Sequence, residues 1–292
     1  MLSNCDMTTG LTGTAMKTFI RVLSILTVLF VAACDRVASV SVVDVETLSA
    51  EEIYQAGERA MAIRGNETAA SYFSEIERLF PYSDWASRGL VMQAFALHKA
   101  KKYDDSRSAA QRYLTFYPTL DDADWAQYLI ALSYYDQIYD VGRDQALTIN
   151  ALQELRKVIE TYPESEYADE ARPRFDLAFD HLAAKEMEVG RYYLSKQEYV
   201  AAINRFRVVV EDFQTTRHTP EALYRLAEAY LALGLGSEAQ SALAILQNDF
   251  ATNEWTADAM VLLGNQGVDT QNFAGSGWLA RVYRQTVKGD WL

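Results

Sequence analysis

Three short stretches of this chain repeat one pattern: FPYSDWA at Phe80–Ala86, YPESEYA at Tyr162–Ala168, and the longer YPTLDDADWA at Tyr117–Ala126. Each has an aromatic residue, a proline, a short polar run, and then an aromatic residue followed by alanine. Proline cannot continue a helix, and small polar residues favour turns and helix starts. The pattern therefore indicates a helix that ends, a short turn, and a new helix that begins.

Helical patterns lie on both sides of these turns. Ser49 and Glu52 have the spacing of a capping box, which marks a helix start. This first helix breaks at Gly65–Asn66, and a second helix ends at Pro81. Together they fill about 34 residues, which is the period of the tetratricopeptide repeat (TPR).

Small and aromatic residues recur in register along the chain. In a TPR array the small residues let paired helices approach, and the aromatic residue fills the gap beside the next pair. The first repeat has Gly57 and Phe73 at these positions. The fourth has Gly190 and Phe206, whereas the third is interrupted by an insertion around Tyr139–Thr148. The sequence predicts an all-α fold, a right-handed α-α superhelix of about five TPR-like helix hairpins.

The stretch MKTFIRVLSILTVLFVAAC, Met16–Cys34, has the positive, apolar and small-residue parts of a secretory signal. Its apolar core is shorter than the roughly 20 residues that cross a bilayer. The final Val-Ala-Ala-Cys resembles a bacterial lipobox, so we expect cleavage before Cys34 and lipidation of its thiol. A plain signal peptide with an accidental cysteine is the alternative. Met1–Ala15 do not fit a signal, and Met16 is a possible true start.

Composition excludes several classes of protein. The formal net charge is −13, and so acidic a surface repels the phosphate backbone of nucleic acids. The two cysteines lie near the N-terminus and the three histidines are far apart, so no zinc-site spacing occurs. We expect no metal and no cofactor.

A search for catalytic residues leaves one weak candidate. Glu164–Ser165 is the only Glu-Ser pair, the dipeptide in which a lytic transglycosylase carries its acid. The pair follows Pro163 at an expected helix start, where acidic and small polar residues are favoured for capping. No nucleophile elbow or phosphate-binding loop occurs. We expect a protein without enzymatic activity.

These patterns divide the chain into segments. We expect a dispensable start and signal peptide, a lipidated tether, a TPR-like repeat domain with two halves, and a C-terminal helix with a loop-rich tail. The closing aromatic and basic stretch could dock on the array, contact a partner, or be disordered. The segments are 1–33, 34–48, 49–251 (halves of about 49–138 and 149–251), and 252–292.

The lipobox, the tether and the repeats together resemble the BamD family of outer-membrane assembly lipoproteins. The stretches that carry the resemblance are EIYQAGERAM at Glu52–Met61 and EMEVGRYYLSKQEYVAAINRF at Glu186–Phe206, together with the proline turns. Arg143–Asp144 resembles the remnant of an acidic loop of that family, although Gly142 replaces the first acid. The resemblance covers about 49–250.

The resemblance implies a non-enzymatic component of the β-barrel assembly machinery that receives unfolded outer-membrane β-barrel proteins. It implies a lipid anchor in the outer membrane, with the repeats in the periplasm. An aspartate directly after the lipidated cysteine, as Asp35 is here, is a signal for inner-membrane retention in enteric bacteria. An anchor in the inner membrane is therefore the alternative location. Implied partners are a BamA-like outer-membrane barrel protein and other small assembly lipoproteins. The competing hypothesis is a periplasmic TPR adaptor that coordinates envelope synthesis or division.

The resemblance also implies two sets of binding residues. Candidates for the contact with the BamA-like partner are Arg205, Asn204 and Tyr192. For Arg205, an ordinary ion pair with a neighbouring acid is the alternative. Candidates for a groove that binds the aromatic-ended strand of a substrate are Tyr54, Trp85, Tyr128 and Tyr135. For these residues, packing between helices is the alternative.

Overall fold

The computed structural model describes residues 45–138, 145–270, 278–279 and 281. Within these residues the chain forms a short 3-10 turn, η1, and eleven α-helices, with no β-strand. The bounds are η1 Val45–Thr47, α2 Ala50–Ala62, α3 Asn66–Leu79, α4 Asp84–Lys99, α5 Tyr103–Phe116, α6 Ala123–Tyr135, α7 Ala146–Thr161, α8 Glu166–Ser195, α9 Tyr199–Asp212, α10 Thr219–Ala232, α11 Gly236–Asp249 and α12 Glu254–Asn265.

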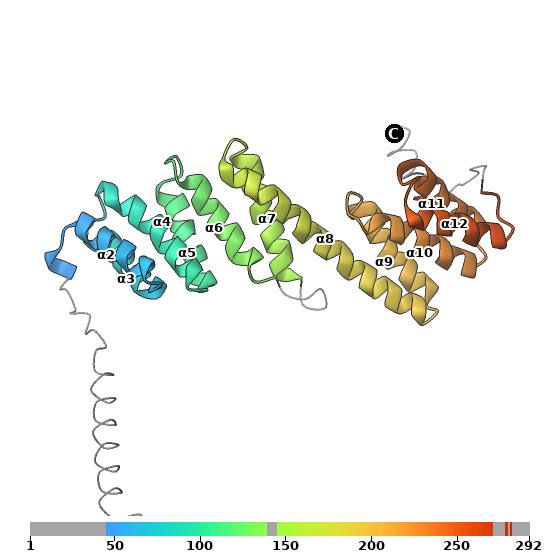
Figure 1. The fold of residues 1–292 in the computed structure, drawn as a ribbon, viewed down its shortest axis with the longest axis horizontal. Coiled ribbons are helices and arrows are strands. Elements are labelled where there is room, and N and C mark those ends of the chain that lie inside the picture. The colour runs from blue at the N-terminus through green and yellow to red at the C-terminus, as the bar shows by residue number, and fades with distance from the viewer. Residues whose placement is uncertain (1–44, 139–144, 271–277, 280, 282–292) are drawn as a thin grey trace, which may run out of the picture. The chain divides into compact units, whose positions relative to one another are not determined.

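The helices are arranged as a row of antiparallel hairpins (Figure 1). From α2 to α11 each helix packs against the next, which pairs α2 with α3, α4 with α5, α6 with α7, α8 with α9, and α10 with α11. The first helices of successive hairpins also touch one another, from α2 and α4 through to α10 and α12. The predicted all-α, TPR-like superhelix is confirmed.

The predicted start of the first helix is also correct. Ser49 and Glu52 form the full capping box: the Ser49 N–H donates to Glu52 Oε2 at 2.8 Å, and the Glu52 N–H donates to Ser49 Oγ at 3.3 Å. The backbone N–H of Ser49 lowers the pKa of the Glu52 carboxyl. The chain therefore enters the repeats through a firmly capped helix.

The repeated sequence pattern forms the turn between hairpins. An aromatic residue ends each second helix and donates its backbone N–H to the carbonyl four residues earlier, as Phe80 does to Ile76. After the proline, Ser165 begins α8 by accepting a hydrogen bond from the Tyr167 N–H at 3.1 Å. The capping aromatic residues are Phe80, Tyr117, Tyr162, Phe213 and Phe250.

Close packing of glycine on phenylalanine fixes the first and fourth hairpins. A Cβ added to Gly57 would lie 2.5 Å from Cε1 of Phe73, and a Cβ added to Gly190 would lie 2.5 Å from Cε1 of Phe206. Both rings have no exposed surface. The small and aromatic positions that set the repeat register are thus in direct contact.

Helix α8 differs from the others because it has 30 residues. It packs against α6 and α7 and also against α9 and α10. Pro173 lies inside it without ending it. One helix therefore passes from the N-terminal hairpins to the C-terminal ones, a feature that was not predicted from the sequence.

The C-terminal residues fold back on the last hairpins. Helix α12 packs against α10 and α11. The Trp278 Nε1–H donates to Tyr230 Oη at 2.8 Å, and Leu279 is buried in the core formed by α8 to α12. The described residues of the tail therefore dock on the array, which is one of the three possibilities given by the sequence. They belong to the same compact unit as the repeats, which runs from Ser49 to the C-terminus.

Candidate partner-binding surfaces

Two of the predicted groove residues lie side by side near the start of the array. Tyr54 of α2 and Trp85 of α4 have ring centroids 5.0 Å apart, and Tyr54 also contacts Phe73 at 5.4 Å. Arg88 lies over the Trp85 ring, with 5.4 Å between its guanidinium carbon and the ring centroid. Tyr54 and Trp85 are partly exposed, so this aromatic pair with its cation remains accessible.

Tyr128 has a different environment, since only 3% of it is exposed. Its hydroxyl donates to Glu170 Oε2 at 2.9 Å, and its ring stacks on Tyr167 at 5.4 Å. Burial raises the pKa of the Tyr128 hydroxyl, and the hydrogen bond to Glu170 raises it further. In this structure Tyr128 therefore packs α6 against α8, as its alternative interpretation supposed.

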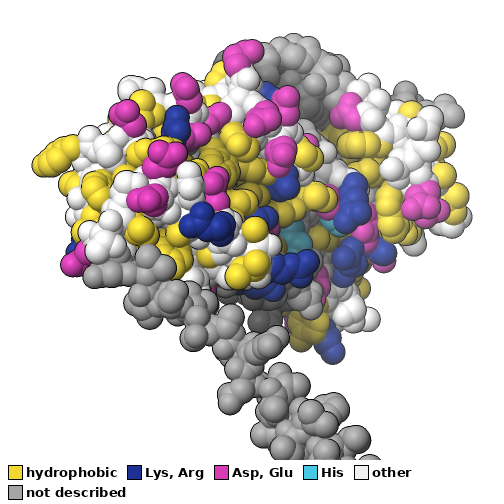
Figure 2. Space-filling view, turned by 60° about the vertical axis from the view of Figure 1, so that its left-hand side comes forward, with side chains coloured by type: hydrophobic (Ala, Val, Ile, Leu, Met, Phe, Trp, Pro, Cys, Tyr) yellow, Lys and Arg dark blue, Asp and Glu magenta, His cyan; other side chains and the backbone are white. Residues whose placement is uncertain are grey.

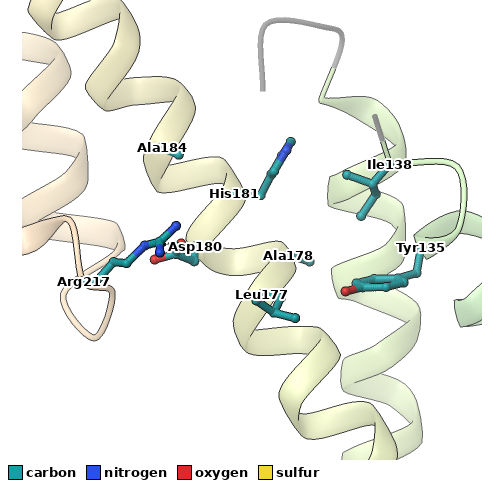
Figure 3. Close-up of a pocket in the computed structure, with 8 residues that line it drawn as sticks. All are labelled: Tyr135, Ile138, Leu177, Ala178, Asp180, His181, Ala184 and Arg217. Carbon is teal, nitrogen blue, oxygen red and sulfur yellow. Dashed lines mark ion pairs between the residues drawn. The ribbon is translucent and has the colours of Figure 1, made fainter. Parts of the chain in front are cut away.

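Tyr135, the fourth groove candidate, lines a cavity of about 350 Å³ beside the middle of α8. Figure 3 shows Tyr135 and Ile138 on one side of this cavity and the α8 side chains on the other. Exposed Leu177 contributes an apolar wall, and Arg217 reaches in from the turn after α9. The lining is Tyr135, Ile138, Leu177, Ala178, Asp180, His181, Ala184 and Arg217.

A charged cluster borders this cavity. Asp180 pairs with Arg217 at 3.0 Å, and His218 Nε2 lies 3.5 Å from the same carboxylate. Burial lowers the pKa of His218, although the Asp180 carboxylate opposes that shift. Figure 2 shows Lys and Arg side chains gathered over the middle of one face, despite the net charge of −13. Asp180 is far along the chain from Arg217 and His218, so no local sequence pattern indicates that they meet.

The residues predicted to contact the BamA-like partner come from two helices that pack together, α8 and α9. Arg205 of α9 is exposed and pairs with Glu186 of α8 at 3.1 Å, and Asn204 beside it is also exposed. Tyr192 is 59% exposed and contacts the Tyr193 ring at 5.7 Å. Asn204 and Arg205 are adjacent on α9, whereas Tyr192 lies near the C-terminal end of α8.

A second aromatic and basic group, not predicted from the sequence, lies at the other end of the array. Tyr224 of α10 and Trp255 of α12 have ring centroids 5.2 Å apart. Arg225 lies over both rings, at 5.2 Å and 5.4 Å, and pairs with Glu228 at 2.9 Å. The stretch FATNEWT at 250–256 could have indicated where Trp255 lies. It forms a turn like the three proline turns of the sequence pattern, but it has no proline.

Other predicted features give no chemical site within the described residues. Glu164 is exposed in the turn before α8. In the described ranges, no group of His, Cys, Asp and Glu side chains could hold a metal ion, and no helix is long and apolar enough to span a membrane. Cys34 and Arg143–Asp144 lie outside the described residues.

Comparison with known proteins gives close relatives. BamD of Caulobacter vibrioides, an outer membrane protein assembly factor, is 41% identical over 250 residues, which cover 85% of this chain and 82% of the relative. BamD of Rickettsia prowazekii is 38% identical over 197 residues, which cover 68% and 78% of the two chains. A solved thermophilic TPR protein of Thermus thermophilus is 18% identical and covers 74% of this chain and 98% of its own, but its TM-score is only 0.33.

The YfiO family, described as outer membrane lipoprotein, has a sequence profile that matches residues 46–260. These residues include every helix of the repeats and most of α12. The chain belongs to the YfiO family of outer membrane lipoproteins.

Proposed function

We propose that this chain is a non-enzymatic, lipid-anchored component of the machinery that assembles β-barrel proteins in the outer membrane. The observation that carries the proposal is its 41% identity, over 85% of its length, with an outer membrane protein assembly factor. The array of helix hairpins supports it, because stacked repeats offer long surfaces for protein partners. The partly exposed aromatic and basic groups on these surfaces suit peptides and proteins as ligands.

For the unfolded substrate, the accessible pair Tyr54 and Trp85 is the proposed contact. A strand that ends in an aromatic residue would stack on these rings, and the guanidinium of Arg88 over Trp85 would attract its terminal carboxylate. Tyr135 would offer a second contact at the cavity beside α8. Tyr128 would hold α6 and α8 together through its hydrogen bond to Glu170.

For the BamA-like partner, the exposed face of α9 that carries Asn204 and Arg205 is the proposed contact. Arg205 is held by Glu186, so a partner carboxylate would have to share or replace that pair. Tyr192, which is 59% exposed on the neighbouring helix α8, is the third residue proposed for this contact.

Two charge-reversal variants, one of them a control, test the α9 contact. Arg205→Glu is compared with Arg78→Glu, since Arg78 is also exposed and ion-paired, to Glu75 at 2.6 Å, but lies on α3. The lipidated protein is purified from detergent-extracted membranes and its partners are identified by mass spectrometry. We expect a barrel protein with periplasmic repeat domains beside the wild type and the Arg78 variant, and its loss from the Arg205 variant. Cell-wall synthases in its place would favour the adaptor hypothesis.

Attachment at Cys34 would place the repeats at the periplasmic face of the membrane. Labelling with radioactive palmitate tests this step, and Cys34→Ala is expected to abolish the label. Separation of inner and outer membranes then shows whether Asp35 retains the protein in the inner membrane. A labelled Cys34→Ala variant would refute the anchor.

A further inference from the structure

Two turns at one edge of the N-terminal hairpins expose large apolar side chains. Tyr82, between α3 and α4, is fully exposed. Phe116 at the end of α5 and Leu120 in the following turn are 61% and 47% exposed. Both turns lead from the second helix of one hairpin to the first helix of the next, so they lie at the same edge of the row.

The matching turns farther along the array are polar. The residue two places after the capping aromatic is Tyr82 in the first turn. In the other four turns that residue is Thr119, Glu164, Thr215 or Thr252. The residue one place later is Leu120 in the second turn, but it is Ser165, Thr216 or Asn253 in the last three. Single exposed apolar residues elsewhere, such as Ile63 at the opposite edge, are normal for a protein surface. The difference between equivalent turns is what needs an explanation.

The chain enters the repeats at this same edge. Ser49 caps the start of α2, and the first turns of α2 and α4 lie side by side, as the 5.0 Å contact of Tyr54 with Trp85 shows. Tyr82 immediately precedes α4. The apolar turns are therefore the ones nearest to the point where the tether joins the repeats.

The tether is short. From Cys34 to Ser49 the chain can reach at most about 50 Å, even when fully extended. A short linker between two binding sites gives the second contact an effective concentration in the millimolar range. Weak contacts between this edge and the anchoring surface would then be well populated.

We propose that the edge formed by Tyr82, Phe116 and Leu120 rests in the interfacial layer of the lipid bilayer to which the chain is anchored. The proposal rests on the lipid anchor of the proposed function. Tyrosine suits this layer because its ring is apolar and its hydroxyl is polar. Asp121 beside Leu120 keeps the contact shallow, since a carboxylate resists entry into the hydrocarbon core.

The chain offers a clean labelling experiment, because it has no cysteine after Cys34. Pro81→Cys places a single thiol next to an intact Tyr82, and Pro163→Cys places one at the equivalent position of the third turn, which is also exposed. Each lipidated variant carries an environment-sensitive dye in vesicles of phosphatidylethanolamine with a minor share of phosphatidylglycerol and a brominated lipid. We expect a blue shift and quenching for Pro81→Cys and neither for Pro163→Cys. Adding Tyr82→Ser should reduce the quenching.

Flotation of each variant with the vesicles separates the two claims. Protein that floats without quenching at Pro81→Cys, or with equal quenching at both positions, refutes the membrane contact but leaves the anchor standing. Protein that does not float refutes both. A blue shift seen only in native membranes, without quenching by brominated lipid, would show that another protein covers the edge and would overturn the proposal.

Discussion

Replacing Gly190 with alanine tests the packing that sets the repeat register. The added Cβ would meet three ring atoms of Phe206 at 2.5, 2.8 and 2.9 Å. Carbon atoms normally pack about 3.5–4.0 Å apart, so the closest contact is short by about 1 Å. The Phe206 ring has no exposed surface, so it cannot move aside without displacing the core residues around it. We therefore expect the ring, and with it α8 and α9, to be forced apart.

The expected loss follows from two opposing effects. Overpacking of a core costs about 1–3 kcal/mol. Alanine favours a helix over glycine by about 1 kcal/mol, which offsets part of this cost. Because the overlap is severe, we expect a net destabilisation of about 1–2 kcal/mol. Urea denaturation followed by circular dichroism would measure it as a lower midpoint.

Two controls isolate the contact. Gly264 lies in α12 with no atom within 4 Å of an added Cβ, so Gly264→Ala should stabilise the protein slightly. Phe206→Leu makes room for the new methyl group, so Gly190→Ala should cost about 1–2 kcal/mol less in that background. An unchanged midpoint for Gly190→Ala, or strictly additive effects in the double variant, would refute the reasoning.

The remaining predictions concern the charged cluster and the docked tail. Burial lowers the pKa of His218 below 6.5, so the unfolded chain binds a proton at this residue more readily than the folded chain does. The free energy of unfolding is therefore highest above the unfolded-state pKa, and it falls as the pH drops towards the folded-state pKa. His218→Gln should flatten this acid-side loss in urea titrations between about pH 7.5 and pH 5.5, and an unchanged slope would contradict the assignment. Trp278→Ala should lower stability by about 2 kcal/mol, because it removes a half-buried ring and leaves Tyr230 Oη without its donor. Trp278→Phe should recover about half of that loss, and equal losses for the two variants would mean that the ring itself contributes nothing.

The turns show what could be predicted from this sequence. The proline turns at Phe80 and Tyr162 were recognised because proline and serine mark them in any context. The equivalent turn at Phe250 has no proline, and the sequence indicated it only as the boundary before a C-terminal helix; Asn253 caps that helix by accepting from the Trp255 N–H at 3.0 Å. Local signals therefore locate a turn only where the residues themselves carry the conformational preference.

The length of α8 and the cluster around it could not be predicted in the same way. No glycine or proline ends the helix between Ser165 and Ser195, since Pro173 and Gly190 both lie inside it. Whether such a run folds as one helix depends on the hairpins that pack on it. Asp180 and Arg217 meet only because the turn after α9 returns to the middle of α8. The burial of Tyr128 likewise depends on tertiary contacts that periodicity does not report.

The central claim is that this chain serves the assembly of outer-membrane β-barrel proteins. Its most direct test is to deplete the protein in its own cells and to measure the folded fraction of outer-membrane β-barrel proteins by their heat-modifiable migration on gels. We predict that the folded forms decline and unfolded precursors accumulate as the protein is lost, while soluble periplasmic proteins keep their levels. Undiminished folded barrels after full depletion would contradict the claim.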